Sequence, residues 1–267
     1  MKVSVVTPSF NHAHFIVDTI ESVLAQDYSD IEYIVVDGLS SDNTVNILKK
    51  YSDRIKWISE VDTGQTEAIN KGLKMASGEI VCFLNSDDLF EKNTISQVVQ
   101  TFRLNPDVKW VYGKCRIVDA NNSEIRHLIT LYKNIISKRF SYRKLLVENF
   151  ISQPATFWKS ELHSEFGYLD ESEHFAMDYE FWCRIGAKHK PTVINSYLSR
   201  FRMYPTSKSG SLTNPVFEDE LRIAKKYSDN SFMLMSLHRL NIFKIETTYF
   251  LMTIYKRSLN KIRCLFR

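Results

Sequence analysis

The 267-residue sequence has few cysteines and no long apolar run. Its four cysteines are far apart and form no CxxC pair, which favours buried thiols in a reducing compartment over a disulfide framework or a zinc site. No stretch approaches the roughly 20 apolar residues that a membrane-spanning helix needs. Met1 is followed directly by the strand-like segment KVSVVTPSF, without the apolar core of a signal peptide, so we expect no export signal.

The sequence also has little excess charge of one sign. Its formal net charge is +4, which argues against a uniformly basic nucleic-acid-binding protein, and we predict no nucleic-acid partner. The charge is unevenly placed, because residues 238–267 contain seven basic residues and one acidic residue. This C-terminal tail has a net charge of +6 and the rest of the chain a net charge of −2, which indicates a separate role for the tail.

Short apolar segments alternate with helix-period segments over the first 120 residues. This alternation predicts an α/β fold, with a mostly parallel sheet covered by helices. The expected strands are VSVVT (3–7), YIVVD (33–37), IKWISE (55–60), GEIVCFLN (78–85) and KWVYGKCRIV (109–118). Helices are expected over 14–26, after Asp42, and over 65–76 and 92–104.

The pattern is looser after residue 120. Further helices are expected over 175–188, over 216–227 and from residue 231, and further strands over 150–158 and 192–204. In open α/β sheets, ligands bind beyond the carboxyl ends of the strands. The polar residues at such ends are Thr7, Asp37, Glu60 and Asn85 to Asp88.

Two adjacent carboxylates, Asp87 and Asp88, directly follow the expected strand at 78–85. Mg²⁺ and Mn²⁺ prefer carboxylate oxygens and bridge them to substrate phosphates, so this pair is a candidate metal site. The alternative is a solvated turn, since two acids are favourable at the start of a helix without any metal. The residues alone do not decide between the two.

Other carboxylates also have two interpretations. Asp37 could bind a base or ribose, or close an Asx turn. Asp62 could serve a ligand or cap the helix that follows. Asp178 and Glu180 stand at the expected start of a helix, where Asp178 could simply be the cap. Because positions two apart diverge by about 200° on a helix, one could face a cleft while the other pairs with Arg184.

The segments that carry these residues resemble family 2 glycosyltransferases, which have the GT-A nucleotide-diphospho-sugar-binding fold. The resemblance implies a mixed, mostly parallel sheet flanked by helices, with a C-terminal helical tail. EVDTGQTEAINKG is similar to the branch that builds bacterial surface polysaccharides. The matching segments, in the family's order, are VSVVTPSFN (3–11), IEYIVVDGLSSDNT (31–44), EVDTGQTEAINKG (60–72), GEIVCFLNSDD (78–88), QPATFW (153–158) and MDYEFWCRI (177–185).

The resemblance implies roles for individual residues. Asp178 matches the catalytic base, and Asp88, supported by Asp87, matches the ligand of a divalent metal, Mn²⁺ or Mg²⁺. Ser86 replaces the first acid of the family's acid–x–acid motif, which leaves open whether Asp87 binds the metal directly or through water. Arg202 or Lys208 would steady the phosphates. The residues implied to bind the nucleotide sugar are Thr7, Pro8, Ser9, Asp37, Asp62, Gly64, Asn70, Lys71, Ser86, Asp87 and Arg202.

The implied reaction is inverting transfer of a sugar from a nucleotide-diphosphate sugar to a glycan or lipid-linked acceptor. A base takes the proton of the acceptor hydroxyl, and a metal stabilises the leaving diphosphate. Two alternatives are a sugar-nucleotide pyrophosphorylase and a non-catalytic nucleotide- or polysaccharide-binding module. The first usually has a Gly-rich phosphate loop, whereas TPSFNHAHF has no glycine. The second would not need Asp37, Asp88 and Asp178 intact.

The charged tail suggests two regions, a GT-A domain over 1–230 and a basic amphipathic helical tail over 231–267. Such a tail can lie in the interface of an anionic membrane, or it can pack on the catalytic domain or a sister subunit. Lipid-linked acceptors imply a cytoplasmic location, peripheral on the inner face of the cell membrane.

Overall fold

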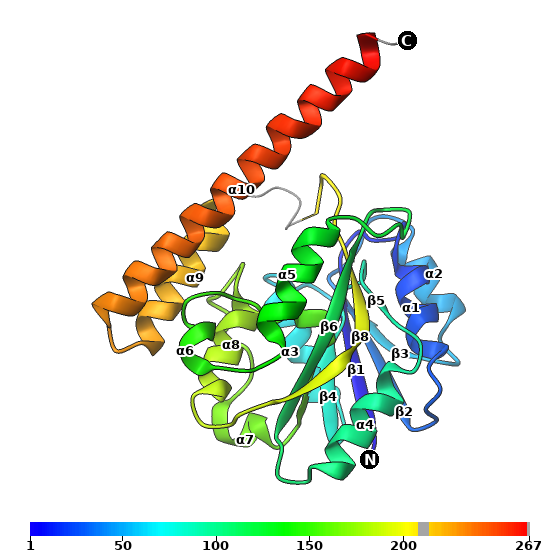
Figure 1. The fold of residues 1–267 in the computed structure, drawn as a ribbon. Helices are drawn as coiled ribbons and strands as arrows, with labels where there is room; N and C mark the ends of the chain where they lie inside the picture. The colour runs from blue at the N-terminus through cyan, green and yellow to red at the C-terminus, as the bar shows by residue number, and fades with distance from the viewer. Residues whose placement is uncertain (208–213, 266–267) are drawn as a thin grey trace.

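A mixed sheet of eight strands, flanked by helices, forms the centre of the protein (Figure 1). The computed structural model describes residues 1–207 and 214–265, without the side chains of residues 214 and 249–265. The strand order is β3-β2-β1-β4-β7-β6-β8-β5. The strands are β1 (Val3–Ser9), β2 (Ile31–Asp37), β3 (Lys56–Ser59), β4 (Ile80–Phe83), β5 (Leu89–Phe90), β6 (Trp110–Val118), β7 (Thr156–Lys159) and β8 (Thr192–Arg202).

The first half of the sheet is parallel, as the sequence predicted. β1 pairs in parallel with β2 and β4, and β2 pairs in parallel with β3. In this register Ser9 lies opposite Asp37, and Asp37 lies opposite Ser59, so the carboxyl ends of three strands meet at one edge. β7 is antiparallel to both β4 and β6, β8 is parallel to β6, and β5 is antiparallel to β8.

The helices confirm the periodic segments of the sequence to within a few residues. Those expected over 14–26, 65–76, 92–104, 175–188 and 216–227 all form. α5, α6, α7 and the short β5 were not predicted, and the segment 150–158 is a strand only in its last part. The helices are α1 (Ile16–Leu24), α2 (Thr44–Lys50), α3 (Gln65–Met75), α4 (Thr94–Leu104), α5 (His127–Ser137), α6 (Tyr142–Leu145), α7 (Leu162–Phe166), α8 (Met177–Gly186), α9 (Asn214–Tyr227) and α10 (Phe232–Leu265), with a 3₁₀ turn at Gln153–Ala155.

Three buried tryptophans join α8 to the sheet. Trp110 of β6 stacks on Trp182 of α8 with ring centroids 5.6 Å apart, and Trp158 of β7 meets Trp182 edge to face at the same distance. Aromatic pairs of this kind stabilise a core beyond the area that they bury. The start of α8 is therefore held firmly against β6 and β7. Cys82 and Cys115 of the same sheet are buried free thiols, as predicted.

The C-terminal helix α10 packs against the body at its beginning. Leu234 and Met235 are buried, and the His238 ring lies 2.8 Å from the carbonyl oxygen of Leu146 through its Nδ1 atom. The later part of α10 extends away from the sheet (Figure 1). The apolar and basic side chains predicted for the tail beyond residue 248 lie outside the described ones. Among the described residues, no helix is long and apolar enough to cross a membrane.

Candidate functional site

A cavity of about 880 Å³ opens at the carboxyl ends of the parallel strands. One wall comes from the end of β1 and from the loops that follow β2, β3 and β4. The start of α8 and the end of β8 form a second wall, and α5, α9 and α10 close the far side. This is the edge of the sheet at which the sequence placed its candidate residues.

The first wall contains a close approach between two loops. Asp62 lines the cavity and lies so near Gly38 that a Cβ atom on Gly38 would be 2.5 Å from Oδ2 of Asp62. Oδ1 of Asp62 accepts a hydrogen bond from the backbone N–H of Gly64, whose φ of 147° is rarely adopted by other residues. Burial raises the pKa of Asp62. Gly38 thus leaves room for this carboxylate, and Gly64 supplies the backbone conformation in which its N–H donates to it.

The residues of β1 and β2 divide between the surface of this wall and the layer beneath it. Pro8 and Ser9 line the cavity, and the Ser9 hydroxyl is buried without a hydrogen-bond partner among the described residues. Thr7 and Asp37 are completely buried and are not among the described lining residues. Asp37 accepts hydrogen bonds from the Ser40 backbone N–H at 2.9 Å and from the Ser59 hydroxyl at 2.7 Å, so it closes the turn after β2.

Asp87 and Asp88 are adjacent in sequence but occupy different positions. Asp87 lines the cavity, and its Oδ2 accepts a hydrogen bond from the Tyr204 hydroxyl at 2.9 Å. Asp88 is fully buried, and its Oδ1 accepts a hydrogen bond from the backbone N–H of Arg202 at 2.9 Å. Burial, together with the charge of Asp87, raises the pKa of Asp88 well above its usual value.

The repulsion between Asp87 and Asp88 favours a hard cation at this place. The charge of Asp87 helps to raise the pKa of the buried Asp88, so the two carboxylates repel each other, and a divalent cation would offset that repulsion. Among the described residues, no group of three or more His, Cys, Asp or Glu side chains could hold a metal. A cation here would therefore complete its coordination with oxygens from a ligand or from water. Ser86, which lines the cavity beside them, forms a hydrogen bond with the ring of His12.

Arg202 brings a buried positive charge to the cavity. Its side chain is completely buried, and its Nη2 donates to Asp18 at 3.0 Å and to Asn122 at 2.6 Å. Nε and Nη1 have no hydrogen-bond partner among the described residues. The guanidinium lies 4.5 Å from the centroid of the Phe15 ring. Buried donors without partners are costly, so this group fits an anionic ligand in the cavity.

Asp178 and Glu180 diverge as predicted. Asp178 lines the cavity, whereas Glu180 is buried on another side of α8 and pairs with Arg184 at 2.6 Å. Asp178 is not the helix cap, because α8 begins at Met177 and Ala176 is the cap residue. Asp178 therefore belongs to the wall of the cavity and is not the N-cap residue of α8.

Asn70 and Lys71 lie away from the cavity wall where the resemblance placed them. Asn70 is buried and donates to the carbonyl oxygen of Leu169 at 2.9 Å. Lys71 pairs with Glu60 and Glu67, at 3.0 Å each. Neither residue is among the described residues that line the cavity, because the face of α3 that carries them turns toward the 169–171 loop and the protein surface. Lys208 lies outside the described residues.

The far side of the cavity holds a polar group that the sequence did not reveal. The Asn149 side chain donates to Glu220 of α9 at 3.1 Å, and Lys133 of α5 lines the same part of the cavity. We call this part, around Asn149 and Glu220, the second lobe. Thr130 Oγ1 and Asn149 Oδ1 are buried without hydrogen-bond partners among the described residues. Burial raises the pKa of Glu220 to about 7, and the charge of Asp178 adds to the shift. These residues come from separate segments, which only the tertiary fold brings together.

Comparison with known sequences agrees with this geometry. Residues 4–163 match the model of Glycosyl transferase family 2. An uncharacterised glycosyltransferase of Nostoc is 36% identical over 129 residues, which are 47% of this chain and 40% of that protein, so the chain spans less than half the length of that relative. The Escherichia coli UDP-Glc:alpha-D-GlcNAc-diphosphoundecaprenol beta-1,3-glucosyltransferase WfgD is 31% identical over 213 residues, 78% of this chain and 80% of WfgD.

Solved structures share the fold. TarS of Staphylococcus aureus, solved with UDP-GlcNAc, has a TM-score of 0.64 at 18% identity, covering 85% of this chain and 66% of that one. The mannosyltransferase PcManGT of Pyrobaculum calidifontis, solved with GDP-Man and Mn²⁺, has a TM-score of 0.63 at 17% identity, covering 97% and 80%. The expected GT-A fold is confirmed, and the chain belongs to glycosyltransferase family 2.

Proposed function

We propose that the protein is an inverting, metal-dependent glycosyltransferase of cell-surface polysaccharide biosynthesis. It would move a sugar from a nucleotide-diphosphate sugar to a glycan or lipid-linked acceptor. The observation that carries the proposal is one cavity, which is lined by Asp62, Asp87, Arg202 and Asp178 and also by a second set of polar residues, Thr130, Asn149 and Glu220. A two-substrate transfer needs such an arrangement, with donor and acceptor on opposite sides of one base.

The donor fits the wall made by Ser9, Asp62 and Arg202. The unpartnered Nε and Nη1 of Arg202 would donate to diphosphate oxygens, and the Ser9 hydroxyl would bond to the nucleoside. The carboxylate of Asp62, beside Gly38 and Gly64, could accept from a base or ribose. TarS and PcManGT support this class of donor, because they were solved with UDP-GlcNAc and GDP-Man.

Asp87 and Asp88 would hold Mn²⁺ or Mg²⁺, which would supply positive charge to the leaving diphosphate. The Mn²⁺ in the PcManGT structure supports this choice. Asp87 is the carboxylate that faces the cavity, and the Tyr204 hydroxyl orients it. The buried Asp88 is fixed to the backbone of Arg202, so the end of β8 and the loop after β4 hold the two carboxylates in place.

Asp178 is proposed as the general base. Its carboxylate would accept the proton of the acceptor hydroxyl while that oxygen attacks the anomeric carbon of the donor. The diphosphate would leave from the opposite face, which gives inversion in a single displacement. The stacked tryptophans fix α8 on the sheet, so Asp178 keeps its place in the wall of the cavity.

The acceptor fits the second lobe. Thr130 and Asn149 offer unpartnered polar atoms to sugar hydroxyls, and Glu220 faces the same space. Ile242 and Ile245 of α10 provide an apolar side to this lobe. The name of WfgD includes a diphosphoundecaprenol-linked sugar, which supports a lipid-linked acceptor and hence a place on the cytoplasmic face of the membrane.

A screen of nucleotide sugars for hydrolysis, with and without Mn²⁺, tests the proposal. We expect Mn²⁺-dependent hydrolysis of one or a few donors, with a matching nucleoside diphosphate that binds in calorimetry. Formation of a nucleotide sugar from a nucleoside triphosphate and a sugar phosphate would instead indicate a pyrophosphorylase. Binding without turnover of any donor, even with acceptor extracts, would indicate a non-catalytic module.

A further inference from the structure

Helix α5 exposes its apolar side to solvent, whereas an ordinary surface helix buries that side in the core. The buried residues on the side that packs on the body are all polar, next to the partly buried Ile136, and Asn134 there donates to the Tyr197 hydroxyl at 2.9 Å. The opposite side carries apolar residues that are 56–76% exposed. The buried side chains are Thr130, Asn134 and Ser137, and the exposed ones are Leu128, Leu131 and Ile135.

This orientation is set by hydrogen bonds to the sheet. The Tyr112 hydroxyl of β6 donates to the carbonyl oxygen of Ser137 at 2.7 Å, and Asn134 bonds to Tyr197 of β8. Turning α5 over would bury its leucines but would break both contacts. A helix normally buries its apolar stripe in the core. An apolar stripe held outward in this way indicates a second apolar phase outside the protein.

The segment that contains α5 carries only basic charges of its own, while two carboxylates contact it from the flanking segments, Glu124 at His127 and Glu148 at Tyr132. Residues 126–144 contain six basic residues and no acidic residue. Lys138 and Arg139 are exposed directly after α5, and Arg143 of α6 is exposed as well. Helices that lie in a membrane interface combine an apolar stripe with flanking basic residues, which attract anionic headgroups.

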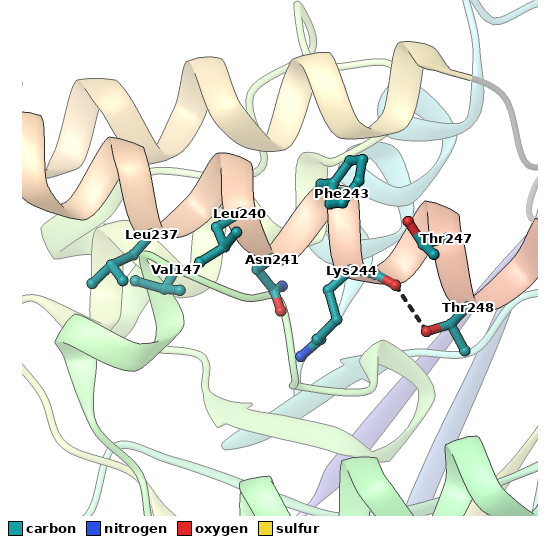
Figure 2. A pocket seen from close by; sticks show the side chains of 8 residues that line it. All are labelled: Val147, Leu237, Leu240, Asn241, Phe243, Lys244, Thr247 and Thr248. Carbon is teal, nitrogen blue, oxygen red and sulfur yellow. Dashed lines mark hydrogen bonds between the residues drawn. The ribbon is translucent and has the colours of Figure 1, made fainter.

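The apolar surface continues onto α10. Lys244 of α10 donates to the hydroxyl of Tyr132 on α5 at 2.7 Å, so side chains of the two helices meet here. A cavity of about 540 Å³ runs along α10, and Leu237, Leu240 and Val147 meet on one side of it (Figure 2). Leu240 and Phe243 are 64% and 66% exposed.

We propose that the outer face of α5, formed by Leu128, Leu131 and Ile135, docks on an anionic lipid bilayer. The exposed apolar side chains would enter the interface, and the basic residues of 126–144 would lie among the headgroups. The same helix contributes Thr130 and Lys133 to the large cavity, so docking places the second lobe about one helix diameter, roughly 10 Å, from the membrane. The docking does not depend on the proposed reaction.

Sedimentation with vesicles tests this surface in the full chain. We expect binding to phosphatidylcholine vesicles that contain phosphatidylglycerol, weaker binding without it, and weaker binding at high salt. The double variant Leu131→Glu/Ile135→Glu should lower the partition coefficient at least about tenfold. It removes two apolar anchors and adds negative charge facing an anionic surface.

Leu104→Glu is the matched control, because Leu104 of α4 is 73% exposed and lies outside this surface. We expect it to bind vesicles like the unchanged protein. Equal binding by the α5 double variant would overturn the proposal and leave the tail as the only predicted membrane contact. Equal losses in both variants would overturn it as well.

Two further measurements distinguish docking on a bilayer from dimerisation and from unfolding of the variant. Sedimentation velocity without lipid detects a second copy on this surface; a dimer that the double variant dissociates, with vesicle binding intact, would overturn the proposal. If the double variant unfolds, Lys138→Glu/Arg139→Glu replaces it, since both side chains are exposed. That variant should lose the preference for phosphatidylglycerol, and an unchanged preference would contradict the proposal.

Discussion

At the scale of single residues, the site separates carboxylates that face the cavity from those that hold its walls. Asp62, Asp87 and Asp178 line the cavity, whereas Asp37 and Asp88 are fully buried beneath it. The buried pair makes hydrogen bonds to backbone N–H groups, which fix the loops after β2 and β4. Substitutions in the first group should therefore change ligand binding or catalysis, and substitutions in the second should also change stability.

Asp178→Asn is the sharpest test of the base. The amide keeps the size of the side chain but cannot take a proton from the acceptor. We expect sugar transfer to fall by about 10²–10⁴-fold while calorimetry shows unchanged binding of the nucleoside diphosphate. Asp107→Asn, on an exposed loop after α4, is the control. Near-normal transfer by Asp178→Asn would exclude Asp178 as the base.

Glu220 predicts a pH dependence of stability. Its pKa rises from the ordinary value of 4.5 to about 7 on folding, so the folded state favours the protonated form. The stability from this group is complete below pH ~4.5 and is lost as the pH rises toward ~7. Glu220→Gln should therefore gain stability relative to the unchanged protein over this range, by at most about 3 kcal/mol.

Urea unfolding at a series of pH values measures this difference. Glu218→Gln on the same helix is the control, because the Glu218 side chain is exposed. A constant difference between Glu220→Gln and the unchanged protein from about pH 4.5 to about pH 8 would contradict the raised pKa.

At the scale of elements, the packing of α8 on the sheet fixes the position of Asp178. Trp182 of α8 packs between Trp110 and Trp158, which belong to β6 and β7. Glu180 pairs with Arg184 within the same helix and accepts a hydrogen bond from the Tyr227 hydroxyl of α9. The helix is thus fixed on one side by aromatic packing and on another by the hydrogen bond to α9, and Asp178 lies on its cavity side.

Trp182→Phe and Trp182→Ala test how strongly Trp182 holds α8 on the sheet. Removing the buried indole leaves a cavity, and we expect Trp182→Ala to lower the free energy of unfolding by about 3–5 kcal/mol. Trp182→Phe should cost less, because it keeps one ring against Trp110. Trp57 of β3 is only partly buried, so Trp57→Ala should cost less than Trp182→Ala in the same denaturant titration. Equal losses would show that α8 has no special anchoring.

At the scale of the whole molecule, the cavity exists because distant parts of the chain meet. Its donor side comes from the parallel half of the sheet, and its acceptor side comes from α5, α9 and α10. α10 belongs to both the wall of the cavity and the predicted tail. The boundary at residue 230 thus separates two segments of sequence, but α10 packs on the body through Leu234, Met235 and His238.

Two truncations test how α10 contributes. Ending the chain after Thr248 keeps the described packing side chains, and we expect little change in thermal stability. Ending it after Asn230 removes two buried apolar side chains, worth about 3–6 kcal/mol together, and should lower the melting temperature by about ten degrees or more. Equal melting temperatures for the two truncated chains would show that the tail is independent of the body.

Much of the donor side could be predicted from the sequence, because it is built from local patterns. Short apolar strand segments end in polar residues, and parallel strands bring those ends to one edge. Asp62 and Asp87 follow such strands, whereas Gly64 and Asp178 were implied by the family resemblance, and all four line the cavity. The resemblance implied that Asn70 and Lys71 stand at the pocket wall, but neither is among the described lining residues. The packing of α3 on the sheet decides which of its faces turns to the cavity, and the sequence does not give that packing.

The amino-acid sequence by itself determined the α/β alternation, the family and the candidate residues of the donor side. These depend on short segments, where propensity and spacing act within a few residues of each other. Only the tertiary structure decided that Asp87 faces the cavity while Asp88 lies beneath it, that Thr130, Asn149 and Glu220 share a lobe, and that α5 exposes its apolar side. Burial and the pairing of polar atoms are set by contacts between segments far apart in the chain, which no local pattern records.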